Sequence, residues 1–102
     1  MITAVFSKAN GNYVGFKISG HSGLSEAGSD ILCAAVSGAT ELAANTVGGK
    51  TSVDEKSASV TVSIPRPDEN SQRIVNALIR QLKGYSEDYP KHIRIEEQEN
   101  VL

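Results

Sequence analysis

The sequence predicts an α+β domain in which a mainly antiparallel sheet has two helices packed on one face. Segments rich in β-branched and aromatic residues are interrupted by two longer segments whose apolar residues repeat at helical spacing. These segments give the order β-β-α-β-β-α-β, and placing both helices on one face of the sheet buries every apolar stripe. The chain has 102 residues, enough for one core, so residues 1–102 are expected to form a single domain.

The composition argues against several classes of protein. Hydrophobic residues make up 39% of the chain and charged residues 22%, which is typical of a soluble globular protein. The net charge of −2 lacks the basic excess of a nucleic-acid-binding protein. The single cysteine forms no intrachain disulfide, and no secretory leader or membrane-spanning apolar run is visible. We therefore expect a cytoplasmic protein that binds neither nucleic acid nor membrane.

The first two strands are expected to form a hairpin. Residues 2–8 and 13–18 are rich in β-branched and aromatic side chains, and Asn10-Gly11-Asn12 between them is a strong turn signal. Residues 20–29 follow with three glycines and three serines, and are expected to form a mobile loop.

A helix is predicted over residues 30–46. Ser29 or Asp30 is a suitable N-cap, and the pair Gly48-Gly49 ends the helix. Cys33 lies off the strongest apolar stripe of this helix. That stripe consists of Leu32, Ala35, Val36, Ala39, Ala43 and Val47.

The second half of the chain repeats the pattern of two strands and a helix. Residues 51–54 and 58–64 are predicted strands, and the alternation in the second indicates a half-buried antiparallel strand. A second helix is expected to start at Asp68 and to end at Gly84. A last strand, residues 91–98, follows.

Cys33 is the residue whose position carries the most chemistry. If Asp30 caps the helix, Cys33 falls in the first turn, where backbone N–H groups lack intrahelical partners and the helix dipole is positive. Both effects favour the thiolate, which is the nucleophilic form of cysteine. The same N–H groups are suited to hold the oxyanion of a tetrahedral intermediate.

His21 lies twelve residues upstream of Cys33, at the end of a predicted strand. Chain reach allows it to return to the helix start as a general base and acid. Asp30 has two competing roles, capping the helix or orienting His21. Ser37, one turn beyond Cys33, is placed either to donate to the sulfur or simply to pack. A plainer alternative makes Cys33 a small buried hydrophobe and His21 a surface residue, and spacing alone leaves both interpretations open.

Other motifs give weaker signals. Gly20-His21-Ser22-Gly23 matches the G-x-x-G pattern of an RNA-clamping loop, but it follows a strand instead of joining two helices. The residues His21, Cys33 and His92 fit no zinc-site spacing, so no metal is expected. His92 itself is expected to be a plain surface residue.

The segment Gly20-His21-Ser22-Gly23, followed by Gly28-Ser29-Asp30-Ile31-Leu32-Cys33-Ala34-Ala35-Val36-Ser37, closely resembles the ribosomal-processing cysteine protease family, Prp. The family pattern is roughly G-H-A-G and then G-x-D-I-V-C-A-A-V-S. The histidine, aspartate and cysteine fall at the matching positions without a gap, and the resemblance extends through Tyr89-Pro90 to the closing strand.

This resemblance implies an endopeptidase that removes the N-terminal extension of the twenty-seventh protein of the large ribosomal subunit, cutting after a phenylalanine. It makes Cys33 the nucleophile, His21 the general base and acid, and Asp30 an assisting residue. It also implies a homodimer, and a loop over residues 22–29 that rearranges around the substrate; no cofactor is expected. The expected substrate contacts are Ser22, Gly23, Leu24, Gly28 and Ser37.

The chain departs from the family pattern at Ser22, where alanine is commoner, at Leu24, where an aromatic residue is common, and at Leu32, where valine is usual. These departures leave the Cys/His pair intact. Two other functions remain open. A noncatalytic ribosome-associated or assembly module would bind the ribosomal protein without cutting it. A thiol redox sensor would oxidise reversibly at Cys33, although the chain offers no resolving cysteine.

Overall fold

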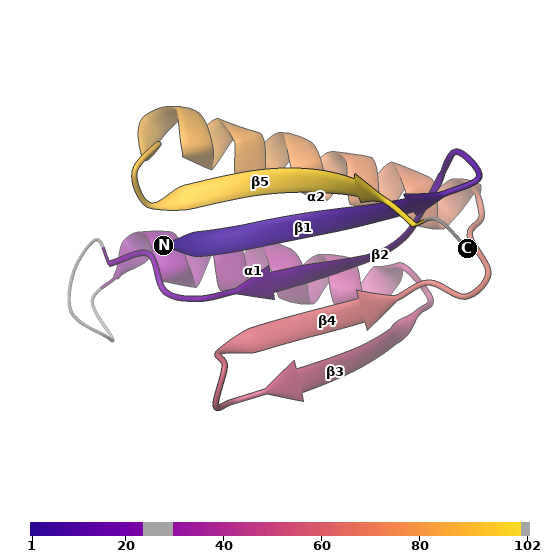
Figure 1. Ribbon diagram of the computed structural model, residues 1–102, viewed down its shortest axis with the longest axis horizontal. Coiled ribbons are helices and arrows are strands. Elements are labelled where there is room, and N and C mark those ends of the chain that lie inside the picture. Colours follow the sequence, from indigo (N-terminus) through magenta and orange to yellow (C-terminus); the bar gives the residue numbers. More distant parts are fainter. Residues whose placement is uncertain (24–29, 101–102) are drawn as a thin grey trace.

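The computed structural model describes residues 1–23 and 30–100, which form one sheet with two helices (Figure 1). Their order along the chain is the predicted one. The elements are β1 (Ile2–Ala9), β2 (Asn12–Ser19), α1 (Ile31–Thr46), β3 (Lys50–Asp54), β4 (Ser59–Ser63), α2 (Glu69–Asp88) and β5 (Ile93–Glu99).

The five strands of the sheet lie in the order β3-β4-β2-β1-β5. β1 pairs antiparallel with β2, and β4 pairs antiparallel with both β2 and β3, whereas β1 and β5 run parallel. Both helices lie on one face of the sheet, behind the strands in Figure 1. The predicted fold class is therefore confirmed, with one parallel pair in an otherwise antiparallel sheet.

The hairpin between β1 and β2 turns where the sequence predicts it. Asn10 and Gly11 have φ values of 53° and 81°, so both central residues are left-handed, as a two-residue type I′ turn requires. The turn sets the pairing of Ala9 with Asn12, the last pair of the hairpin.

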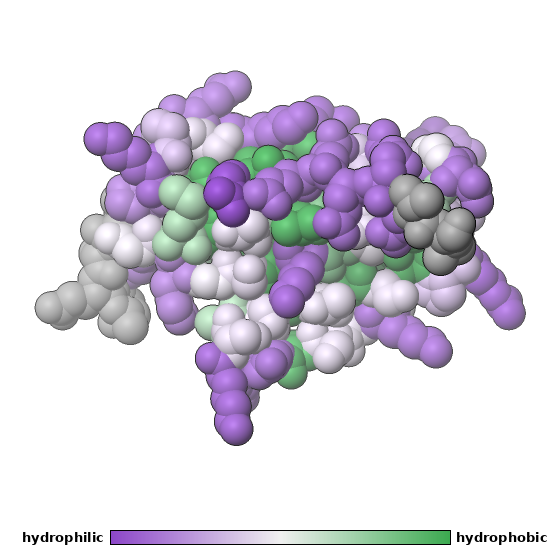
Figure 2. All heavy atoms as spheres, viewed as in Figure 1, coloured by the Kyte–Doolittle hydropathy of each residue, from purple (hydrophilic) through white to green (hydrophobic). Residues whose placement is uncertain are grey.

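The core lies between the helical layer and the sheet. Large side chains from every layer are almost fully buried there, among them Phe6, Phe16, Leu32, Val62, Leu82 and Ile93. The opposite face of the sheet is turned to the viewer in Figure 2, and hydrophilic side chains cover much of it. Within the described ranges, neither helix is both long and apolar enough to cross a membrane.

The second helix is longer than the sequence predicts. α2 does not end at Gly84 but runs on to Asp88, and the N–H of Tyr89 still donates to the carbonyl of Tyr85 at 2.8 Å. A Cβ at Gly84 would meet nothing within 4 Å, so this glycine serves no close approach and is simply a poor helix former inside a helix. The helix stops just before Pro90, because the residue preceding a proline disfavours the helical conformation.

One end of the sheet brings together segments that are far apart in the sequence. β1 pairs with β2 on one side and with β5 on the other, and the N–H of Ile2 donates to the carbonyl of His92 at 2.9 Å. Gly20 passes so close to β1 that a Cβ would lie 2.3 Å from the carbonyl oxygen of Met1, and its φ is +88°. Both observations require glycine there. The chain leaving β2 therefore meets the chain entering β5.

Candidate active site

The N-terminus of α1 places Cys33 in the first helical turn, as predicted. Asp30 is the N-cap, with φ −81° and ψ 102°, and its Oδ1 accepts the backbone N–H of Cys33 at 3.0 Å. The carbonyl of Asp30 accepts the N–H of Ala34 at 3.2 Å. Asp30 therefore has the capping role, one of the two that the sequence left open.

The Asp30 cap occupies N–H groups that were candidates to stabilise the oxyanion of a tetrahedral intermediate. The sequence pointed to the N–H groups of the first helical turn as its donors. The N–H of Cys33 and that of Ala34 both already donate to Asp30. An oxyanion formed at Cys33 must therefore draw on donors other than these two N–H groups as long as the cap stays closed, so the first-turn donors that the sequence predicts reduce to Ile31 and Leu32.

Ser22 is the residue that joins the parts of the site. Its backbone N–H donates to the sulfur of Cys33 at 3.3 Å, and its hydroxyl donates to Oδ2 of Asp30. Its carbonyl oxygen lies 2.8 Å from Nδ1 of His92. Ser22 is only 2% exposed; its bond to Asp30 is buried, and its bonds to Cys33 and His92 are partly buried. An N–H donated to sulfur stabilises the thiolate more than the thiol, because the bond is then charge-assisted.

His21 lies near Cys33 because it directly precedes Ser22 in the chain. The N–H of Ser22 touches the sulfur, and the exposed side chain of His21 lines the cleft that Cys33 also lines. The structure therefore brings His21, Asp30 and Cys33 together at one end of a cleft, as their flanking of one loop suggested.

The cleft has a volume of about 800 Å³ and lies between α1 and the part of the sheet formed by β2, β4 and β3. Its walls are mostly small or apolar, and Cys33 is half-buried in them. Beyond the three site residues, the lining includes Ile18, Val36, Ser37, Thr40, Glu41, Ala44, Asn45, Thr51, Val53 and Val60.

The expected substrate contacts fall in different places. Ser37 is exposed and lines the cleft, but within residues 1–23 and 30–100 no hydrogen bond joins its hydroxyl to Cys33. Gly23 is exposed, with φ +69°, and does not line the cleft. Ser22 is buried, does not line the cleft, and forms hydrogen bonds with Cys33 and Asp30. Leu24 and Gly28 lie outside the described residues.

His92 is the site residue that the sequence analysis missed. It was expected to be plain surface, but it is half-buried and binds the carbonyl of Ser22 across 70 positions of sequence. No local motif marks it, because its position depends on the parallel register of β5 against β1. The described residues hold no group of three or more His, Cys, Asp or Glu side chains arranged to bind a metal ion.

A cysteine in the first turn of a helix, an N–H aimed at its sulfur and a histidine on the same cleft are features typical of a cysteine peptidase. The family model of cysteine protease Prp matches residues 1–94. The chain therefore belongs to the cysteine protease Prp family, and it is a cysteine protease.

Solved structures share the fold along almost the whole chain. The essential ribosomal processing protease Prp from S. aureus, in complex with a covalently linked product peptide, has a TM-score of 0.87 at 22% identity and covers 96% of this chain and 100% of its own. SMU.848 from Streptococcus mutans has a TM-score of 0.83 at 22% identity, covering 98% and 99%. No curated protein gives a significant match to this sequence.

Proposed function

We propose that this protease removes the N-terminal extension of the twenty-seventh protein of the large ribosomal subunit, with Cys33 as nucleophile and His21 as general base and acid. The observation that carries the proposal is the hydrogen bond from the N–H of Ser22 to the sulfur of Cys33, because it fixes the thiol beside the residue that follows His21. The S. aureus relative, a ribosomal processing protease in complex with a substrate peptide, supports the choice of substrate.

The proposed reaction passes through a thioester. The Cys33 thiolate attacks the scissile carbonyl carbon, and the proton held by His21 goes to the leaving amine as the C–N bond breaks. Water, deprotonated by His21, then attacks the thioester, which releases the carboxylate product and returns the thiol. These steps need a thiolate and an imidazole, and they use no metal and no organic cofactor.

The cleft suits an extended and partly apolar peptide. Ile18, Val53 and Val60 offer it an apolar floor on the sheet, and α1 forms the facing wall. No lysine or arginine is present among the described residues that line the cleft. Of its two carboxylate residues, Asp30 caps α1 and Glu41 lies farther along the same helix. A phenylalanine on the amino side of the cut bond, as in the family pattern, finds apolar surface here.

We also infer the setting of this activity. The protein works in the cytoplasm, where ribosomal proteins are made and its single thiol stays reduced. Its active form is a homodimer, as the family resemblance implies. Its partner is the ribosomal protein itself, and no direct contact with nucleic acid or membrane is required.

Mass spectrometry of the ribosomal protein after incubation with the purified protease tests this proposal. The wild type is expected to remove a defined N-terminal peptide, and both Cys33→Ala and His21→Ala are expected to leave the mass unchanged. Ser86→Ala, at the end of α2 and away from the cleft, is the control and should cut normally. Full cleavage by Cys33→Ala would end the proposal.

The same experiment separates the rival functions. A noncatalytic assembly module would bind the substrate and leave its mass unchanged even as wild type. A redox sensor would show reversible peroxide modification of Cys33 and no peptide product.

A further inference from the structure

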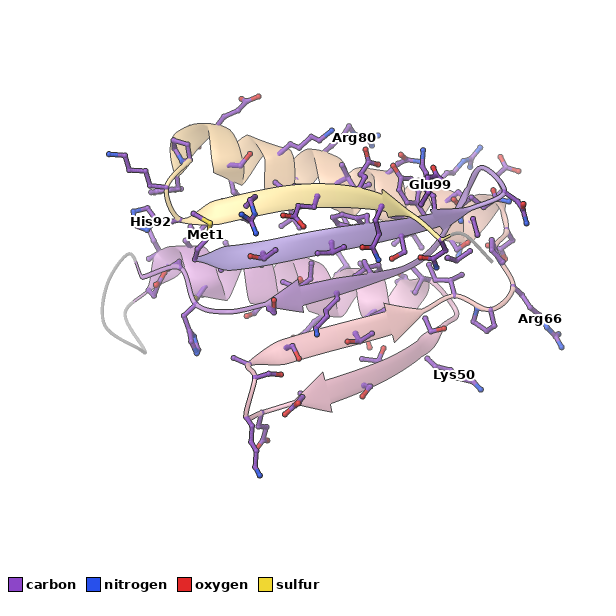
Figure 3. All side chains as sticks on the ribbon, in the orientation of Figure 1. Met1, Lys50, Arg66, Arg80, His92 and Glu99 are labelled. Atoms are coloured by element: carbon purple, nitrogen blue, oxygen red, sulfur yellow. The ribbon has the colours of Figure 1, made fainter. Side chains whose placement is uncertain are left out.

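The backbone of His92 is fixed on both sides just before β5 begins. Its N–H donates to the carbonyl of Tyr89 at 2.9 Å, and its carbonyl accepts the N–H of Ile2 at 2.9 Å. Figure 3 shows His92 beside Met1 at the end of the sheet where β1 starts. The half-buried imidazole therefore projects from a rigid turn, and its direction is set by the pairing of β5 with β1.

The imidazole of His92 is bound to the backbone of the site. Its Nδ1 lies 2.8 Å from the carbonyl oxygen of Ser22, and a carbonyl only accepts hydrogen bonds, so Nδ1 carries the hydrogen. The N–H of the same serine donates to the sulfur of Cys33. One residue thus connects the imidazole of His92 to the nucleophile.

The short segment His21-Ser22 lies between two glycines and depends on contacts with other elements to fix its conformation. Gly20 and Gly23 stand on either side of His21-Ser22, and both adopt positive φ, 88° and 69°. Glycines allow a wide range of backbone angles, so the short segment between them is not held by its own conformational preferences. Contacts from other elements therefore help to set its direction, among them those of Asp30 with the hydroxyl and of His92 with the carbonyl of Ser22.

We propose that His92 is a positioning residue of this protease: by holding the carbonyl of Ser22, it keeps the N–H of Ser22 aimed at the sulfur of Cys33. The same bond fixes Ser22, the residue that directly follows His21. His92 itself does not line the cleft and takes no part in bond making. The inference rests on Cys33 as the nucleophile of the proposed function.

Two substitutions separate positioning from simple packing. His92→Asn keeps a donor, because the amide Nδ2 occupies the place of the imidazole Nδ1, whereas His92→Leu keeps similar bulk and removes the donor. The readouts are the rate of alkylation of Cys33 by iodoacetamide at pH 7 and steady-state cleavage of the ribosomal protein. For His92→Leu we expect both the alkylation rate and kcat to fall about 5-fold with KM unchanged, the size expected for one lost hydrogen bond. His92→Asn should retain at least about half of both wild-type rates.

The control is Gln98→Leu, which breaks the 3.1 Å bond from Nε2 of Gln98 to the Ser7 hydroxyl at the far end of β5. It should leave alkylation and kcat at wild-type values. If His92→Leu does not fold, His92→Gln replaces it, because its amide nitrogen lies one bond farther out; it should then show the same 5-fold loss.

A folded His92→Leu protein that is alkylated at the wild-type rate overturns the proposal, as do equal losses in the asparagine and leucine variants. Because alkylation of Cys33 is measured without substrate, this outcome is independent of whether the ribosomal protein is cut. The proposed function fails instead if Cys33→Ala still cleaves.

Discussion

The two helices of this protein begin with the same kind of N-cap and complete it differently. Asp68 caps α2 and accepts the N–H of Ser71 at 2.7 Å, and the Ser71 hydroxyl accepts the N–H of Asp68 at 3.0 Å, which makes a reciprocal capping box. Asp30 caps α1 and accepts the N–H of Cys33 at 3.0 Å. The third position of α1 is a cysteine, and its sulfur accepts the N–H of Ser22 instead.

The cap of α2 serves only the stability of its helix, whereas the cap of α1 also positions a nucleophile. In α2 both side chains of the cap are used to satisfy the helix, and Ser71 is fully buried. In α1 the third side chain is left for another purpose, half-buried at the end of an apolar cleft. The same local geometry that stabilises one helix thus presents a sulfur nucleophile in the other, where the N–H of Ser22 donates to that sulfur.

The largest effect is expected from Cys33→Ser, which makes the α1 cap resemble that of α2. The new hydroxyl is placed to reciprocate with the N–H of Asp30, so the melting temperature should stay level or rise. Peptide cleavage should fall by at least about 1,000-fold, because a hydroxyl is a much weaker acid and a weaker nucleophile than a thiol. Calorimetry and cleavage assays check both effects, and a variant that is inactive only because it is unfolded would contradict this view.

The two caps should separate stability from activity when each is removed. Asp68→Ala and Asp30→Ala should each lower the free energy of unfolding by about 1 kcal/mol, a drop of about 4–8 °C in melting temperature for a domain of this size. Only Asp30→Ala should also reduce cleavage, by about 10-fold, because it frees the Ser22 hydroxyl and the Cys33 N–H. Denaturant titration measures the free energy of unfolding, and cleavage assays at 25 °C measure activity. An equal loss of activity in Asp68→Ala would show that the two caps do not differ in function.

The smallest effect concerns the helical glycines. Gly38 in α1 and Gly84 in α2 both lie inside helices, and a Cβ added at either position would meet nothing within 4 Å, so alanine fits at both. Gly38→Ala and Gly84→Ala should each raise the free energy of unfolding by about 0.5–1 kcal/mol without altering cleavage. A loss of activity in Gly38→Ala alone, measured beside Gly84→Ala, would show that α1 needs freedom that α2 does not.

Sequence alone predicts the features that neighbouring residues determine. The Asn10-Gly11 turn, the Asp30 cap and the place of Cys33 in the first turn all follow from signals within a few positions of one another. α2 continues past the predicted end at Gly84 because glycine only weakens a helix, and the packing of Tyr85 and Tyr89 against the core outweighs that cost.

The parts of the site that depend on strand register could not be read from the sequence. The link from His92 to Ser22 exists because the parallel pairing of β5 with β1 brings residues 70 positions apart to one end of the sheet. Likewise, the hydrogen bonds of Ser22 to Cys33 and to Asp30 form because the chain that leaves β2 folds back over the start of α1. Local propensity carries no information about either contact.

The parallel pairing of β1 and β5 also orders events during synthesis. Among the described elements, β2 directly follows β1 along the chain, whereas β5, which pairs with the other edge of β1, is synthesised only after α2. Until then a row of backbone donors and acceptors on β1 stays unsatisfied, the kind of edge at which nascent chains pair wrongly with one another. The sheet, and with it the tie from His92 to the site, is therefore complete only after β5 has been made and has paired with β1.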